Sequence, residues 1–497
     1  MTIMWTLIGI IFFIILTIVI YMSRNFYYWR KLGVTQITPY PFFGNFADYF
    51  FKSQSPGDIV KKFYNQYKNK PYVGIYIVDK PTLLLIDPKI IKSILATNFH
   101  EFSDKFMKSS KHDPLSNRSL PFLSHFEWNK LRKKLSPAFT PKKIRADFNY
   151  LIEVTNDLDE YLDSLNLEIG KTINIKEICA KYTTDIIGLI CFGLKLNSLK
   201  NDDAEFRKFG KMMFGDFTLW RSFELTAIYL TPSYIKDFFD CRFFEKKSGE
   251  FFAKEFKKII ESREESGINR NDLLDILIEI KNEERLELND IIAQAIVLFT
   301  AGFDTTSTLM SFTLFELASN IEIQKKLRKE IEENLKKTNG VITYDMVMSL
   351  RFLDSVICET LRLHPTVPTI DRTATKDFII QETGLKIEKD TPIMISLTGL
   401  HYDKNYFKNP EIFDPKNFEK SENLTGPPYM PFGIGPRMCP AFHQGRTLAK
   451  YGIIHLISKY FITLSTESSV KVDHRVYFTS GKEGLYLQLQ KIDSNMD

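Results

Sequence analysis

The strongest pattern along the chain is an unbroken apolar run at its N-terminus. Residues 3–22 carry no charged side chain, and about twenty apolar residues are enough for one helix to cross a bilayer. Arg24, Arg30 and Lys31 follow the run, so the positive-inside rule places the rest of the chain in the cytoplasm. A cleaved signal peptide would have a basic start, a shorter apolar core and a small-residue cleavage site. These features are missing, and we expect residues 1–23 to be an uncleaved transmembrane anchor.

The next segment, residues 24–45, is a basic and proline-containing hinge. Pro39 and Pro41 fix φ and stop a continuing helix, so the anchor does not run rigidly into the domain that follows. Two interpretations stay open: an ordinary linker, or a stiff spacer that sets the tilt of the domain on the membrane.

Residues 46–497 predict one large domain, because no repeat, low-complexity tract or long Gly/Ser linker divides them. Helical spacing of apolar residues is clearest in residues 148–165, 178–192, 291–318 and 324–335. Short strand-like runs occupy residues 72–78, 82–86, 391–396 and 484–489. The fold class predicted is therefore mainly α with small β-sheets, and the early and late strands are expected to share one sheet.

The helical segment 291–318 is apolar on nearly all faces, which indicates burial in a large core. Gly302, Asp304, Thr305 and Thr306 interrupt it in the middle. A glycine weakens a helix, a buried acid needs a partner, and a threonine can bond back to the preceding turn. The segment is either a kinked core helix with a solvated Asp304 or part of a functional site.

Composition narrows the class of protein. Hydrophobic residues make up 44% of the chain and phenylalanine contributes 42 residues, which suits a large folded core. The net charge of +5 gives no reason to expect a nucleic-acid partner. An odd number of cysteines without a CxxC pair favours a reducing compartment over a disulfide scaffold. The five are Cys179, Cys191, Cys241, Cys358 and Cys439.

The segment around Cys439 reads PFGIGPRMCPAFHQGR over residues 431–446. Its prolines and glycines predict an irregular loop before Cys439, and a helical pattern resumes after Pro440. A cysteine just before a helix start is expected to have a lowered thiol pKa and to be a good soft ligand for iron.

Two other interpretations of Cys439 remain. A lone cysteine is usually a small buried hydrophobe, and His443 makes half of a zinc site without a second half nearby. No HExxH, GxSxG or Walker lysine motif occurs, so a hydrolase or a nucleotide-driven enzyme has no support.

The cysteine segment resembles the cysteine loop of the cytochrome P450 monooxygenases. Its matching positions are Phe432, Gly435, Arg437, Cys439 and Ala441. Further similar motifs occur in the family's order: a Trp/Arg pair at Trp128 and Arg132, AGFDTT at residues 301–306, Glu-x-x-Arg at Glu359–Arg362, and the proline hinge. Residues 128–144, 182–199 and 399–415 resemble the insect microsomal detoxification branch.

This resemblance implies the cytochrome P450 fold after one transmembrane helix, haem b with Cys439 as the ligand to its iron, and insertion of oxygen into a lipophilic molecule. Electrons would come from NADPH through NADPH–cytochrome P450 reductase, with cytochrome b5 as a second candidate donor. The protein would lie in the endoplasmic reticulum membrane with its catalytic domain on the cytoplasmic face.

The resemblance also implies roles for individual residues. Asp304 and Thr305 would deliver protons, Ala301 would leave room above the iron, and Phe432 would pack beside the sulfur. The propionate partners would be Trp128, Arg132, Arg372 and Arg437. The substrate pocket would include Thr366, Val367, Thr369, Ile370, Phe478 and Thr479, with parts of residues 111–122 and 214–223.

One departure from the family pattern is Asn417, which stands where an arginine is usual. The Glu359–Arg362 pair then lacks one charge, although an amide still forms hydrogen bonds and backbone groups are alternative partners. Unusual residues after Cys439 and a basic cluster at residues 130–143 leave the reductase docking site open: the cluster is either a solvated face or a docking surface.

Two rival functions share the haem-thiolate fold. One is an isomerase or dehydratase that needs no reductase, and the other is a non-catalytic haem-binding membrane protein. Asp304 and Thr305 argue against both, because neither needs a proton relay.

Overall fold

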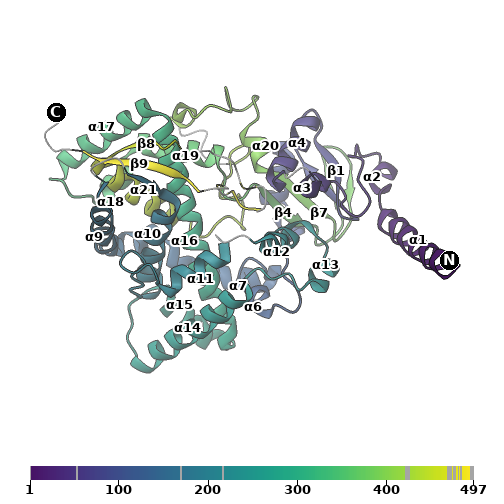
Figure 1. The fold of residues 1–497 in the computed structure, drawn as a ribbon, viewed down its shortest axis with the longest axis horizontal. Helices are drawn as coiled ribbons and strands as arrows, with labels where there is room; N and C mark the ends of the chain where they lie inside the picture. The colour runs from purple at the N-terminus through teal and green to yellow at the C-terminus, as the bar shows by residue number, and fades with distance from the viewer. Residues whose placement is uncertain are drawn as a thin grey trace.

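The computed structural model describes residues 2–51, 54–167, 171–214, 218–419, 426–466, 473, 477–479, 481 and 484–492. Helices dominate these residues and three small sheets lie among them (Figure 1). This confirms the predicted class, mainly α with small β-sheets.

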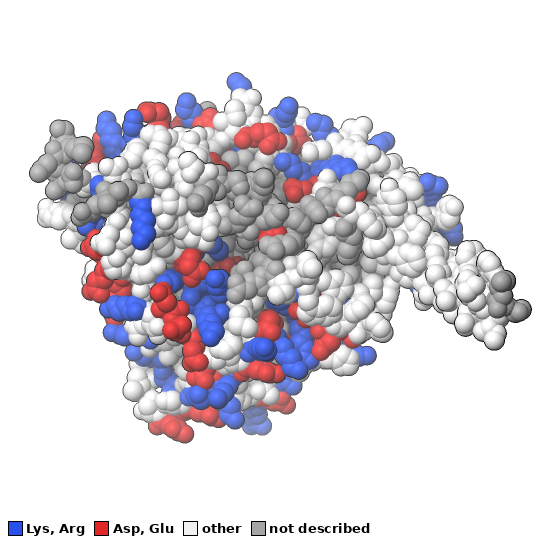
Figure 2. All heavy atoms as spheres, in the orientation of Figure 1, with Lys and Arg blue, Asp and Glu red and all other residues white. Residues whose placement is uncertain are grey.

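The N-terminal helix α1 (Thr2–Ser23) projects from the body of the protein (Figure 1). Its large apolar side chains are exposed, as in Phe12 and Phe13, and its mean hydropathy over a membrane-length window is 2.9. An apolar helix with no protein around it is suited to lipid. Figure 2 shows α1 without blue or red atoms, in contrast to the mixed charges of the body. Helix α1 is thus a candidate membrane anchor.

The segment after the anchor packs against the first sheet. Trp29 in α2 (Tyr28–Lys31) is almost fully buried, and its indole Nε1 donates to the carbonyl of Ile75 at 3.2 Å. The Ile37 N–H donates to the Gly74 carbonyl at 3.0 Å. Asp79 binds Arg24 and also accepts from Tyr234 Oη at 3.0 Å. The start of this segment is therefore tied to the body by specific contacts.

The largest sheet joins strands from both ends of the chain. Its order is β1 (Tyr72–Ile77), β2 (Lys80–Leu85), β7 (Pro392–Ser396) and β4 (Thr369–Thr373). Strands β2 and β7 are parallel, and the other two pairs are antiparallel. The expectation of a shared sheet is confirmed for residues 391–396.

The same expectation is wrong for residues 484–489. Strand β9 (Tyr486–Lys491) pairs with β8 (Tyr460–Leu464) and β3 (Thr172–Asn174) in a separate sheet. Antiparallel pairing with β8, a near neighbour in sequence, competes successfully with a distant sheet. The third sheet is a short pair, β5 (Phe378–Ile379) and β6 (Lys386–Ile387).

Helix α16 (Leu288–Ser319) runs through the middle of the helical body (Figure 1). Around it lie α10 (Ile175–Phe192), α14 (Lys246–Ser266), α15 (Leu273–Glu284) and α21 (Phe442–Lys459). Helix α10 is capped at its start by Asn174, whose side chain accepts from the Glu177 N–H, and at its end by Gly193, whose φ is +68°. These end signals fix where α10 meets α16.

The remaining helices cover the core and the sheets. In chain order they are α3 (Ala47–Phe51), α4 (Pro56–Tyr67), α5 (Pro88–Lys92), α6 (Pro114–Asn117), α7 (His125–Leu135), α8 (Pro141–Ala146), α9 (Phe148–Ser164), α11 (Glu205–Phe214), α12 (Leu219–Leu230), α13 (Ser233–Phe238), α17 (Ile321–Lys337), α18 (Tyr344–Ser349), α19 (Arg351–Leu363) and α20 (Leu397–His401).

Candidate active site

Helix α16 has exposed residues in its middle, although most of the helix is buried. Ala301 and Thr305 are exposed, and both lie on one face because they are four residues apart. The Thr305 hydroxyl donates to the Ala301 carbonyl at 2.7 Å. Gly302 lies against α10, where an added Cβ would come within 3.0 Å of Ile187. A larger residue there would require the Ile187 side chain to shift.

The loop before α21 folds back on itself and presents Cys439. The Cys439 N–H donates to the Phe432 carbonyl at 2.9 Å. Gly435 has a φ of +73° and lies so close to the Leu95 carbonyl that a Cβ would collide with it. Phe432, Cys439 and Ala441 are all partly exposed. The predicted irregular loop and the helix after it are confirmed.

The first turn of α21, which follows this loop, meets α16. A Cβ on Gly445 would be 3.7 Å from the hydroxyl of Thr306. The open turn of α16 and the cysteine loop therefore belong to neighbouring elements. Cys439 would be the residue that holds a ligand bound at this loop, and Ala301 and Thr305 would be candidates to face that ligand.

The prediction of a lowered thiol pKa is wrong for Cys439 in this structure. Burial raises its pKa, and that effect outweighs the hydrogen bond from the Ala441 N–H and the charges of Arg132 and Lys105, which lower it. The sequence indicated the helix start but not that burial of the Cys439 thiol would outweigh it.

Three arginines beside the cysteine loop each keep a buried nitrogen without a hydrogen-bond partner in the described part of the chain. These atoms are Nε of Arg132, Nε of Arg372 and Nη1 of Arg437. The other Arg437 nitrogens are held: Nε donates to the Ser103 carbonyl and Nη2 to the Leu123 carbonyl, both at 3.0 Å. Its guanidinium also lies 4.3 Å from the Trp128 ring centroid. All four sequence-predicted propionate partners are thus placed in this part of the fold or close to it.

Two further basic residues join this group, and sequence reasoning missed both. His125 Nδ1 is also buried without a partner in the described residues, and its ring stacks on Trp128. Burial lowers the pKa of Lys105 to about 8, against the charge of Asp371. The available signal was weak: His125 lies one helical turn before Trp128, on the same face.

The chemistry of these donors fits a ligand with carboxylates. The Asp371 carboxylate accepts from the backbone N–H groups of Phe106 and Met107, at 2.7 and 3.0 Å. Buried guanidinium nitrogens without partners are costly, and bidentate binding of a carboxylate satisfies them. Haem b offers two propionates and an iron that a thiolate binds, so the residues present fit that group.

The Glu359–Arg362 pair is fully buried on α19. Glu359 accepts from Nε and Nη2 of Arg362, both at 2.7 Å, and from the Asn417 side-chain amide at 3.1 Å. Arg362 donates further to backbone carbonyls of His401, Pro410 and Ile412. Backbone groups do hold the pair, as the sequence reasoning considered, and the amide of Asn417 keeps one hydrogen bond.

The predicted pocket residues come together from β4 and the C-terminal region. The Thr479 N–H donates to the Thr366 carbonyl at 3.0 Å, and Thr369 bonds the hydroxyl of Tyr477. Val367 and Ile370 are partly exposed on the same stretch. A cavity of about 220 Å³ lies beside them, lined in part by Pro368, Tyr477, Phe478 and Thr479.

Aromatic rings close this region. Phe214 and Phe478 approach at 6.1 Å between centroids, and Tyr229 stacks on Tyr477 at 3.8 Å. Phe243 contacts both Phe122 and Phe214. Residues 215–217 of the predicted pocket range 214–223 lie outside the described residues. The sequence reasoning missed Tyr229, Phe243 and Tyr477, which no local motif marks.

The structure adds no support for a disulfide scaffold or for a zinc site at His443. All five cysteines are free. Among the described residues, no cluster of three His, Cys, Asp or Glu side chains is arranged to hold a metal ion, so a second half for a zinc site at His443 is not seen there.

The fold and site define a haem-thiolate enzyme, and sequence comparison agrees. The family profile described as "Cytochrome P450" matches residues 35–488, so the chain belongs to the cytochrome P450 family. It is 36% identical to cytochrome P450 6k1 of Blattella germanica, over 91% of this chain and 92% of that one. It is 33% identical to a probable cytochrome P450 6g2 of Drosophila melanogaster, over 94% and 95%. The protein is a P450 monooxygenase related to these insect proteins.

Proposed function

We propose that this monooxygenase inserts one atom of molecular oxygen into a lipophilic small molecule, with electrons from NADPH through NADPH–cytochrome P450 reductase. The observation that carries the proposal is the convergence of Cys439, the arginine nitrogens and the open face of α16. When bound, haem b supplies the iron at which oxygen is activated. The aromatic rings of Phe122, Phe214, Phe243 and Phe478, which contact one another in this region, suit a lipophilic substrate.

Each site residue has a proposed role in this reaction. Cys439 holds the iron, and Phe432 packs beside the sulfur. The propionate side is held by Trp128, Arg132, Arg372 and Arg437, and we add His125 and Lys105. Ala301 leaves space on the oxygen side, and Thr305 holds and passes a proton through its hydroxyl.

The membrane arrangement is also proposed. Residues 1–23 would anchor the protein in the endoplasmic reticulum membrane, residues 24–45 would connect it, and residues 46–497 would form the catalytic domain on the cytoplasmic face. The exposed apolar helix and the basic residues after it support this orientation. The resemblance of residues 128–144, 182–199 and 399–415 to the insect microsomal detoxification branch supports a role in oxidising foreign compounds.

The reductase would dock on the face that carries α21. Of the basic cluster at residues 130–143, Lys130 and Lys134 are already paired with Glu284, which weakens the docking interpretation of that cluster. A groove of about 460 Å³ beside α21 is lined by Arg351, Arg446 and Lys450, but also by Glu330, Asp354 and Glu419. Arg446 and Lys450 are already paired with Asp354, so Arg351 is the basic lining residue that we propose for an acidic partner. We expect Arg351→Glu to slow reductase-driven turnover at low salt more than Lys133→Glu does.

The experiment that tests the proposal uses the full-length protein with haem. The carbon monoxide difference spectrum of the reduced protein reports thiolate ligation, and Cys439→Ala should remove that signal and the activity. NADPH-dependent product with reductase supports monooxygenation. Product from a peroxide without reductase would favour the isomerase or dehydratase class. Thiolate ligation with neither reaction would favour a non-catalytic haem-binding protein.

A further inference from the structure

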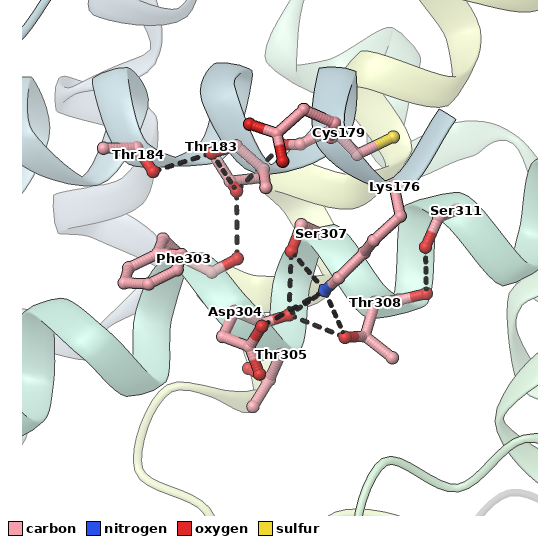
Figure 3. A network of polar contacts seen from close by, with 12 residues as sticks. Lys176, Cys179, Thr183, Thr184, Phe303, Asp304, Thr305, Ser307, Thr308 and Ser311 are labelled. Atoms are coloured by element: carbon pink, nitrogen blue, oxygen red, sulfur yellow. Dashed lines mark hydrogen bonds and ion pairs between the residues drawn. The ribbon is translucent and has the colours of Figure 1, made fainter. Parts of the chain in front are cut away.

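The ammonium group of Lys176 binds one turn of α16, beside the open face. Its Nζ lies 3.2 Å from both Oδ1 and the carbonyl oxygen of Asp304 (Figure 3). It lies 2.8 Å from the Ser307 hydroxyl and 2.6 Å from the Thr308 hydroxyl. An ammonium has three N–H donors, so these four oxygens occupy all of them. Lys176 comes from the first turn of α10, not from α16.

The same turn of α16 is arranged around the Asp304 carbonyl. The hydroxyls of Ser307 and Thr308 donate to that carbonyl at 2.9 and 2.8 Å. Their lone pairs are then free to accept from Lys176, which closes the network. The Asp304 side chain is about a fifth exposed, with 21% of its surface accessible, and it is ion-paired. Asp304 is therefore not the solvated acid of a merely kinked core helix, and Lys176 is the partner that a partly buried acid needs.

This contact points the Asp304 carboxylate away from the reaction space. Figure 3 shows Asp304 turned toward Lys176, whereas the neighbouring Thr305 lies on the exposed face and bonds the Ala301 carbonyl. Successive helical residues project about 100° apart, so Asp304 cannot share that face without leaving Lys176. The Lys176 contact therefore sets how readily the carboxylate turns toward the Thr305 side.

The first turn of α10 also holds the helix that covers the pocket. Glu177 binds Arg207 of α11 through two bonds, Nε to Oε1 at 2.9 Å and Nη2 to Oε2 at 2.7 Å. Gly210 of α11 rests on the Phe303 ring, where a Cβ would lie 2.9 Å from the ring. Helix α11 ends at Phe214, which contacts Phe478. A shift of α11 would thus be felt on both sides of Asp304.

We propose that Lys176 is a positioning residue for proton delivery: it fixes the Asp304 carboxylate, and α10 links that contact to the position of α11. The inference rests on the proposed function, because it deepens the role of Asp304 in the same site. It requires no contact between Lys176 and substrate or haem.

The test compares Lys176→Met, Lys176→Arg and Asp304→Asn with the parent, each as haem-loaded protein with reductase. Lys176→Met should keep the carbon monoxide spectrum and substrate affinity. Its product formed per NADPH consumed should fall about fivefold, within the range by which contacting residues couple, and its solvent isotope effect should change. Lys176→Arg keeps the charge, and its product formed per NADPH consumed should lie between the values of the parent and of Lys176→Met. The double variant Lys176→Met/Asp304→Asn should be no worse than Asp304→Asn.

Lys200→Met is the matched control, because it removes a lysine from an exposed pair with Asp157 and should leave all readouts at the parent's values. If Lys176→Met gives the parent's product yield and isotope effect, or if its loss adds to that of Asp304→Asn, the inference is overturned. If Lys176→Met does not fold, Lys176→Arg decides, and parent-like values there also overturn it. A parent protein without NADPH-dependent product would instead refute the proposed function.

Discussion

Replacing Glu359 by glutamine tests what supports the cysteine loop. The carboxylate accepts four hydrogen bonds: Nε and Nη2 of Arg362, the Asp414 N–H and the Asn417 amide. Glutamine offers one oxygen and an NH2 donor. At least one Arg362 donor would then face another donor, and its charge would lose its buried partner. Breaking a buried pair in this way costs about 3–5 kcal/mol.

Asn417 gives the matched comparison. Asn417→Ala removes an amide hydrogen bond to a charged acceptor and should cost about 1.5–3 kcal/mol. Asn417→Arg restores the residue usual in the family, yet we expect it to gain little. Three donors remain without the Asn417 amide, and a carboxylate has roughly four acceptor positions, so an arginine at 417 can fill only the position that the amide fills now. The structure thus explains why this chain tolerates an amide at position 417.

The assay is a urea titration of the haem-loaded proteins, followed by the visible absorption of bound haem. The midpoints should fall in the order parent, Asn417→Ala, Glu359→Gln, and their spacing converts to free energy through the slope of each curve. Thermal scans at several heating rates check whether unfolding is reversible. Equal midpoints for Glu359→Gln and Asn417→Ala, or a Glu359→Gln loss below about 1 kcal/mol, would refute the reasoning.

Three further predictions concern His401, Arg437 and Thr305. Burial lowers the pKa of His401 from 6.5 to about 3. The contribution of His401 to the free energy of unfolding is therefore complete above pH 6.5, and it declines below pH 6.5 by about 1.4 kcal/mol per pH unit. The urea midpoint of the parent should fall between pH 7 and pH 5, and the midpoint of His401→Gln should depend less on pH. Arg437→Leu should lower haem retention against apomyoglobin more than Lys133→Leu, an exposed control; equal retention would remove Arg437 from the site. Thr305→Ala should keep the carbon monoxide spectrum but release reduced oxygen instead of product, and a product yield equal to the parent's would refute the role of Thr305.

Local patterns predicted the parts of the fold that local physics determines. The anchor, the buried helix α16 and the helix after Cys439 follow from apolar spacing and end signals, and each lies near its predicted residues. The placement of β9 was wrong because alternation indicates a strand but not its partner. The predicted direction of the Cys439 pKa shift was wrong because burial of the thiol raises the pKa and outweighs the lowering by Ala441, Arg132 and Lys105, and that burial arises only in the assembled fold.

The site was predictable only where a short motif carries it. Arg437 and Glu359 belong to such motifs, whereas His125, Lys105 and Tyr229 contribute through contacts between distant segments. Lys176 is a clear case: its partner Asp304 is 128 residues away, and no spacing within α10 marks it. Ion pairs and aromatic contacts between elements need the assembled fold to become visible.

The buried pair and the cysteine loop are joined by a short chain of hydrogen bonds through His401. Its Nδ1 lies 3.2 Å from the Arg362 carbonyl, and its Nε2 lies 3.4 Å from the Met430 N–H. Only the neutral ring with its proton on Nδ1 satisfies both groups. The Met430 carbonyl in turn accepts from Gly433 at 2.8 Å, inside the loop that carries Cys439. Weakening the hydrogen bonds of Glu359 should therefore disturb thiolate ligation before the helical body unfolds, because the cysteine loop depends on these hydrogen bonds through His401 and α16 does not.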